Sequence, residues 1–317
     1  MKLINFFLIF IISTIFTSCF RVEDKLEPKF SYNIEETNID LKKNPFRPLS
    51  PEEKNTDWAK EYIIAKKFAN ELDLYRSITN FKRAKILLDD KDLYRIREMD
   101  YYLMLSYFLA KKYEDVINVF DKSSLDRVDK KFEAYHDLLI MLYESYYHLE
   151  EKDKYTRVLE LLEEYYPNEG KKIVLSTAMI DADIEKIEEI ALTPPGNDKL
   201  IDLVNTYYKN KKSVASAQIL NAVLPGAGYL YIGQKKSAIT SFFLNASFIY
   251  ASYEFFQRGY TAAGIITVSF EAGWYFGGIY GAGEEARFYN ERLYECMASP
   301  IMKKDKLLPV FMLKYGF

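Results

Sequence analysis

The sequence is poor in the residues from which covalent, metal and catalytic sites are usually built. Its 317 residues include two cysteines and two histidines. Cys19 and Cys296 are too few for a disulfide framework, so packing must hold the fold together. His136 and His148 stand twelve residues apart without a cysteine or carboxylate ligand pattern, which argues against a metal site.

Neither sign of charge is in excess. The chain has 43 Lys and Arg against 46 Asp and Glu, a formal net charge of −3, which leaves no basic footprint for nucleic acid. A nucleophile elbow, a Walker loop, a zincin helix and a dinucleotide fingerprint are also missing from the sequence. We therefore predict a protein that is not an enzyme, with no catalytic residues, no cofactor, no metal and no nucleic-acid partner.

Residues 1–19 have the pattern of an export signal, with Lys2, an apolar core over residues 3–15, and Cys19 at the end. Small residues directly before a cysteine resemble the lipobox of bacterial lipoproteins. The resemblance implies lipidation of Cys19 and a membrane-anchored position in the cell envelope, at either the inner or the outer membrane. Phe16 stands where that family has Leu, so an uncleaved signal anchor stays open as the alternative.

Residues 20–57 are charged, lack apolar periodicity and contain four prolines. Such a composition cannot bury enough apolar surface to offset the entropy of ordering. We predict a disordered tether here.

Residues 58–192 carry apolar residues at helical spacing between short polar breaks. An aromatic residue followed by an apolar stripe recurs at Tyr75, Tyr113 and Tyr155, each time after an apolar helix. The pattern resembles tetratricopeptide (TPR) repeats, although its intervals of 38 and 42 residues exceed the family's repeat of about 34. The resemblance implies a curved helical array that binds a protein or peptide ligand; a plain helical bundle is the alternative.

Residues 193–212 form a proline-containing connector and one helix, and a Pro-Gly break follows within residues 213–283. The string Pro225-Gly226-x-Gly228-x-x-Tyr231-x-Gly233 resembles an element that opens small bacterial membrane domains of unsettled function. Pro225 should end the preceding helix. Gly226 and Gly228 should permit a tight reversal of the chain with its backbone close to another element.

Two apolar runs, residues 237–256 and 260–283, each have about the 20 residues that a membrane helix requires. With the polar turn at residues 257–259 they predict a membrane helical hairpin, and buried helices of a soluble domain are the alternative. Asn245 and Glu271 lie equally far from Arg258, so we expect them to form a polar pair inside the hairpin.

Gly273, Gly277 and Gly281 recur every four residues, a spacing that lets two helix backbones approach closely. They predict a contact with a third helix or with a second copy of the chain, and hence a homo-oligomer. The pattern of residues 284–317 predicts an amphipathic helix and a tail.

Together these patterns predict an all-α protein, a TPR-like helical-repeat array followed by a C-terminal membrane helical hairpin. The function that fits is a membrane-anchored scaffold that binds a partner protein or peptide at the bacterial cell envelope. Two alternatives remain: an accessory lipoprotein of outer-membrane assembly, and a small channel or transporter element formed by the hairpin.

Overall fold

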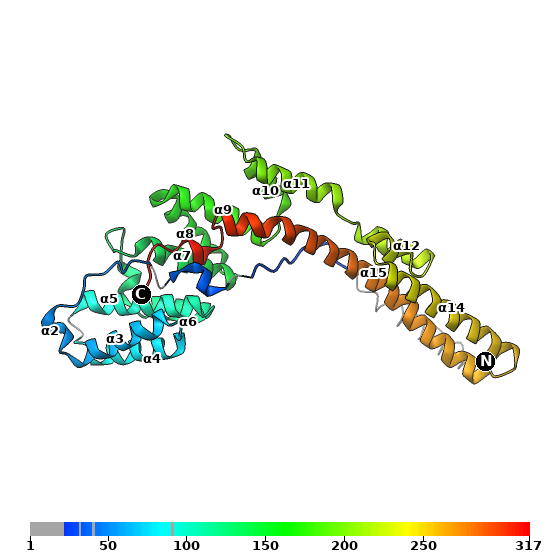
Figure 1. The fold of residues 1–317 in the computed structure, drawn as a ribbon, viewed down its shortest axis with the longest axis horizontal. Coiled ribbons are helices and arrows are strands. Elements are labelled where there is room, and N and C mark those ends of the chain that lie inside the picture. Colours follow the sequence, from blue (N-terminus) through cyan, green and yellow to red (C-terminus); the bar gives the residue numbers. More distant parts are fainter. Residues whose placement is uncertain (1–21, 32, 40–41, 90–91) are drawn as a thin grey trace. The chain divides into compact units, whose positions relative to one another are not determined.

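The computed structural model describes residues 22–317 except 32, 40–41 and 90–91. The export signal and the predicted lipidation site Cys19 lie outside these residues. Within them the regular elements are helices, with one isolated bridge between Lys43 and Tyr315. The predicted all-α class is thereby confirmed for the described chain, and its helices form a repeat-like series (Figure 1).

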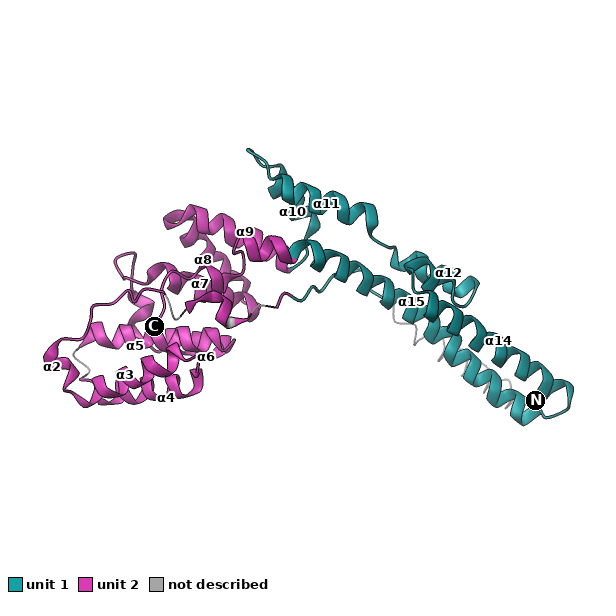
Figure 2. Cartoon of the chain, in the orientation of Figure 1, with its two compact units in different colours: residues 1–29, 181–298 teal, residues 30–180, 299–317 magenta. Residues whose placement is uncertain are grey.

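The chain divides into two compact units, coloured separately in Figure 2. One unit joins residues 30–180 to residues 299–317, and the other joins the N-terminal stretch through residue 29 to residues 181–298. Each unit therefore combines segments that are far apart in the sequence.

The first of these units, called the array here, is a succession of antiparallel helices, each packed on the next. Its elements are η1 (Ile34–Thr37), α2 (Pro51–Lys54), α3 (Asp57–Asn70), α4 (Leu74–Leu87), α5 (Leu93–Leu109), α6 (Tyr113–Asp121), η3 (Ser124–Arg127), α7 (Tyr135–His148), α8 (Lys152–Tyr165), α9 (Pro167–Ile180) and α16 (Pro309–Met312). Helices α5 and α7 are buried along almost their whole length, so they form the centre of this unit.

The same turn recurs between paired helices of the array. Leu72, Lys111 and Glu150 each have a left-handed backbone, with φ between 56° and 59°. At each turn the amide that follows bonds the carbonyl five residues earlier at 2.9 Å, as in Asp73 N–H to Phe68 O. This Schellman geometry closes the helix and reverses the chain in three residues. The turns lie 39 residues apart, so the repeat is more regular in structure than the aromatic spacing indicates.

The second unit is built from α10 (Ile184–Leu192), α11 (Asp198–Asn210), α12 (Val214–Val223), α13 (Ala227–Ile232), α14 (Lys235–Gln257) and α15 (Thr261–Lys304), of which residues up to 298 belong here. Helix α15 is continuous for 44 residues, whereas the sequence predicts a separate helix from residue 284. Arg287 pairs with Glu284 at 2.8 Å and Glu291 at 3.1 Å along one face, and these local ion pairs carry the helix through the predicted boundary.

Helix α14 and the first half of α15 run side by side as a hairpin (Figure 1). A Cβ on Gly264 would lie 2.8 Å from the Phe256 ring, and one on Gly278 would lie 3.9 Å from Ser241 Oγ, so the two helices are in contact at both ends. Among the described helices, none combines the length and the apolar character that crossing a bilayer requires.

The described residues of the predicted tether pack against helices. Val22 and Leu26 are buried, and the Lys29 amide donates to Glu295 Oε1 at 2.6 Å. Further along, Phe46 is buried among aromatic rings of the array. The structure differs from the prediction because the partners of this stretch lie far away in the sequence, where local composition cannot show them.

Candidate functional site

The Pro-Gly break is a packing junction between helices. Gly226 has φ 94°, and a Cβ there would lie 2.3 Å from Ala238 O. A Cβ on Gly228 would lie 2.3 Å from Ala217 O and 2.9 Å from the Cβ of Ala282. Only glycine fits at either position, so the motif allows α13 to pack at backbone distance from α12 and α14.

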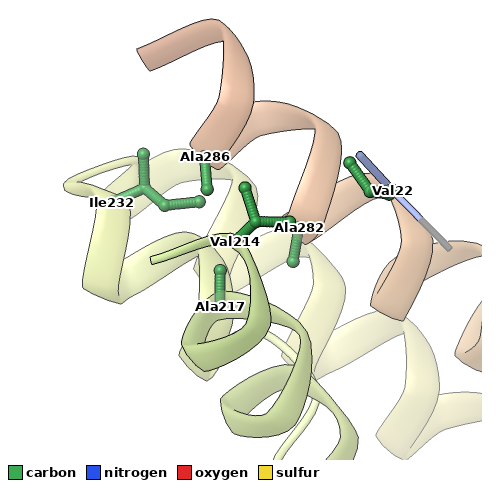
Figure 3. Packing of buried hydrophobic residues seen from close by; sticks show 6 residues of the cluster. All are labelled: Val22, Val214, Ala217, Ile232, Ala282 and Ala286. Atoms are coloured by element: carbon green, nitrogen blue, oxygen red, sulfur yellow. The ribbon is translucent and has the colours of Figure 1, made fainter. Parts of the chain in front are cut away.

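Small apolar residues fill this junction, as Figure 3 shows. The buried cluster comprises Val22, Val214, Ala217, Ile232, Ala282 and Ala286. Asn221 is also buried, and its Oδ1 accepts the Gly226 amide at 2.8 Å. The Tyr275 hydroxyl donates to Ala222 O at 2.6 Å, so polar groups of the break are satisfied inside the junction. Gly226 and Gly228 of the break thus have a structural role in this junction.

The three glycines of the predicted packing stripe have different surroundings. A Cβ on Gly281 would lie 2.6 Å from the Tyr229 hydroxyl, so Gly281 packs against α13. Gly273 and Gly277 have nothing within 4 Å of an added Cβ in the described chain. Their face of α15 is therefore open, and contact with a second copy remains a prediction.

Asn245 and Glu271 do not form the expected hydrogen bond. Asn245 Nδ2 donates to Ser241 O at 2.7 Å, while Asn245 Oδ1 and Glu271 Oε2 are buried without a hydrogen-bond partner in the described chain. Burial raises the pKa of Glu271.

The most elaborate polar site lies in the array, on residues that the sequence patterns did not single out. It binds the extended residues 313–317 that follow α16, and we call residues 307–317, which include α16, the C-terminal segment. Asp137 on α7 is fully buried. Its Oδ1 accepts the Lys314 amide at 2.9 Å, and its Oδ2 accepts the Tyr315 amide at 2.8 Å.

Neighbouring side chains fix this carboxylate in position. His136 Nδ1 lies 2.7 Å from Asp137 Oδ1, and the Tyr101 hydroxyl donates to Oδ2 at 3.3 Å. Lys42 donates to the carbonyl of Leu313. Burial lowers the pKa of Lys42, and the charge of Asp137 opposes that shift.

A second buried cluster holds the stretch before α2 against α5. Arg95 is fully buried and donates to both carboxylate oxygens of Glu53 at 2.9 Å and to Glu98 Oε2 at 2.6 Å. The same guanidinium donates to the carbonyls of Arg47 at 3.0 Å and Pro48 at 3.1 Å. Hydrogen bonding to Arg95 lowers the pKa of Glu53 to about 2.

Comparison of the chain with protein-family models, with curated proteins and with solved structures found no match to any of the three. Function must therefore be argued from the surfaces and sites described above. Two of them call for an explanation beyond packing: the exposed surface of the α14–α15 hairpin and the site around Asp137.

Proposed function

We propose that the protein is a helical-repeat scaffold attached to a lipid membrane by its α14–α15 hairpin, with the array as the part that binds a partner protein or peptide. The hairpin embeds its apolar surface in lipid without crossing the bilayer. The array, whose helix pairs resemble tetratricopeptide repeats, supplies the binding site for the partner.

The observation that carries the membrane attachment is the exposed surface of the hairpin. Between residues 239 and 280, fifteen large apolar or aromatic side chains are exposed: Ile239, Phe242, Phe243, Ile249, Tyr250, Tyr253, Phe256, Tyr260, Ile265, Ile266, Val268, Phe270, Trp274, Phe276 and Tyr280. Soluble monomers rarely expose so many apolar side chains together, and such surfaces mark contacts with proteins or membranes.

Four hydroxyl side chains of the hairpin form hydrogen bonds with backbone carbonyls of their own helix. The hydroxyls of Ser247 and Ser269 are on exposed residues, yet they donate to Phe243 O at 2.7 Å and Ile265 O at 2.9 Å. Ser252 and Thr267 bond in the same way. Such bonds satisfy these four hydroxyl donors without water, which favours a lipid environment for this surface.

Charge on the hairpin is sparse, and two of its three charged residues are paired. Between residues 239 and 280 the only charged residues are Glu254, Arg258 and Glu271. Glu254 and Arg258 form an ion pair at 2.9 Å beside the turn, which reduces the cost of bringing them near lipid. Lys235 and Lys236 lie at the opposite end of α14, where they can remain in water or contact anionic headgroups.

Flotation with phosphatidylcholine vesicles tests the attachment, using a chain that begins at Val22 so that the apolar leader cannot contribute. We expect this chain to float with the vesicles. The triple variant Phe243→Asp, Ile266→Asp, Phe270→Asp should lower the bound fraction by at least about tenfold, because each change removes a large apolar contact with lipid.

The matched control is the triple variant Ile64→Asp, Tyr75→Asp, Ile86→Asp, whose residues are exposed apolar side chains of the array. This variant should bind vesicles like the unsubstituted chain. If neither the unsubstituted chain nor the control floats, or if both triple variants lose binding equally, the hairpin is not the lipid-binding element.

A further inference from the structure

We propose that the site around Asp137 is a peptide-binding site, that the C-terminal segment is its occupant in cis, and that a partner peptide of the same chemistry replaces it in trans. The ligand is an extended peptide with a basic residue followed, after one further residue, by Gly-Phe. This inference names the partner class of the proposed scaffold and rests on that function, but it is independent of the membrane attachment.

The site recognises the backbone of the segment at four successive residues. Lys42 donates to Leu313 O, the Lys314 and Tyr315 amides donate to Asp137, and the Gly316 amide donates to Lys43 O at 3.2 Å. Groups outside the segment supply each of these partners. Main-chain hydrogen bonds of this kind bind extended peptides with little dependence on sequence.

Three residues of the segment supply selectivity. Phe317 is buried, and its ring centroid lies 5.8 Å from that of Tyr102. A Cβ on Gly316 would lie 2.0 Å from Ile39 O, so only glycine fits at this position. Lys314 Nζ lies 3.7 Å from Glu169 Oε1 and 5.2 Å from the centre of the Tyr166 ring. These contacts select a cation, a glycine and an aromatic ring in that order.

The buried carboxylate makes the site dependent on an occupant. An Asp137 side chain that lost both peptide amides would be left buried with fewer hydrogen-bond donors, which is unfavourable. The C-terminal segment and a partner peptide therefore compete for one set of acceptors. Replacement of the C-terminal segment by the partner peptide is therefore more favourable than release of the segment to leave the site empty.

Fluorescence anisotropy with a labelled peptide of residues 307–317, acetylated and amidated at its ends, tests this directly on the full chain. In Gly316→Val, the protein's own segment cannot dock, while every residue of the site is unchanged. We expect this variant to bind the peptide at least about tenfold more tightly than the wild-type chain, because occupancy in cis lowers apparent affinity. A labelled peptide carrying Val at its glycine position should not bind.

Adding Asp137→Asn to Gly316→Val should weaken peptide binding by about tenfold, because the amide side chain cannot accept on both atoms. If folded Gly316→Val binds no peptide, or no more than wild type, the proposal is overturned.

If Gly316→Val does not fold, hydrogen exchange of the wild-type Lys314 and Tyr315 amides tests the proposal instead. Excess unlabelled peptide should accelerate the exchange of these two amides, and unchanged exchange rates would overturn the proposal. Vesicle flotation involves none of these residues, so either idea can fail alone.

Discussion

Arg95 and Glu53 are joined by two parallel hydrogen bonds of 2.9 Å, and this pair connects α2, at the end of the predicted tether, to the buried helix α5. The Arg95 guanidinium is inaccessible to solvent, so the carboxylates of Glu53 and Glu98 compensate its charge in place of water. A segment whose composition is typical of disorder is thereby ordered by one buried cation. The Arg95–Glu53 pair therefore predicts how the free energy of unfolding changes in acid.

Glu53→Gln should lower the free energy of unfolding at pH 7 by about 2 kcal/mol, because a charge-assisted bidentate bond is lost. The pKa of Glu53 is lowered from 4.5 to about 2, so its stabilising effect is present above pH 4.5 and is lost as the pH falls toward 2. Urea unfolding between pH 7 and pH 2 should show a weaker acid destabilisation in the variant than in wild type.

The neighbouring change Glu52→Gln is the control for that experiment. Glu52 accepts from the Ser50 hydroxyl at 2.8 Å and does not contact Arg95. Glu52→Gln should leave the free energy of unfolding nearly unchanged, because the Glu52 carboxylate is exposed and solvent screens its interactions. Equal losses in the two variants would show that the bidentate pair is not what fixes this stretch.

Two glycines of the second unit should respond to alanine in opposite directions. Gly228→Ala places a Cβ 2.3 Å from Ala217 O, and we expect a loss of about 1–3 kcal/mol from overpacking. Gly277→Ala meets nothing within 4 Å and lies inside α15, so it should gain about 0.5–1 kcal/mol. Chemical unfolding followed by circular dichroism measures both, and changes of the same sign would contradict the packing described for the break.

Glu271→Gln should stabilise the protein at neutral pH by about 1 kcal/mol, because the amide does not carry the charge that burial disfavours. Burial raises the pKa of Glu271. The group's contribution to stability is therefore full below its unfolded pKa and is lost as the pH rises through the folded value. The advantage of the variant should shrink toward pH 4.

Glu254→Gln serves as the comparison for that pH series. Glu254 is paired with Arg258 near the hairpin turn, and its removal should not raise stability at pH 7. A Glu271→Gln variant that is less stable than wild type at pH 7 would mean that the carboxylate has a partner that the structure does not contain.

Local patterns in the sequence predicted the helices well because each helix is specified by residues three and four positions apart. The apolar stripes after Tyr75, Tyr113 and Tyr155 correspond to α4, α6 and α8. The Pro-Gly string also predicted a chain reversal with close backbone contact, and Gly226 and Gly228 have those roles.

The site around Asp137 could not be predicted in this way. Asp137 and the Lys314 amide that it accepts are 177 positions apart, and Asp137 lies among ordinary helix-forming residues. An acidic residue at the start of an apolar helical stretch was the one available signal. The pairing of Asn245 with Glu271 failed for a related reason, since equal distances from a turn do not fix the register of two packed helices.

The central claim, that the hairpin lies in lipid, is tested most directly by tryptophan fluorescence. The chain has two tryptophans: Trp274 is exposed on the hairpin, and Trp58 is buried in the array. In the variant Trp58→Phe, vesicles should shift the emission of Trp274 to shorter wavelength, and brominated lipids should quench it. The variant Trp274→Phe should show neither effect. Trp274 emission that is unchanged by vesicles and brominated lipids would contradict the account.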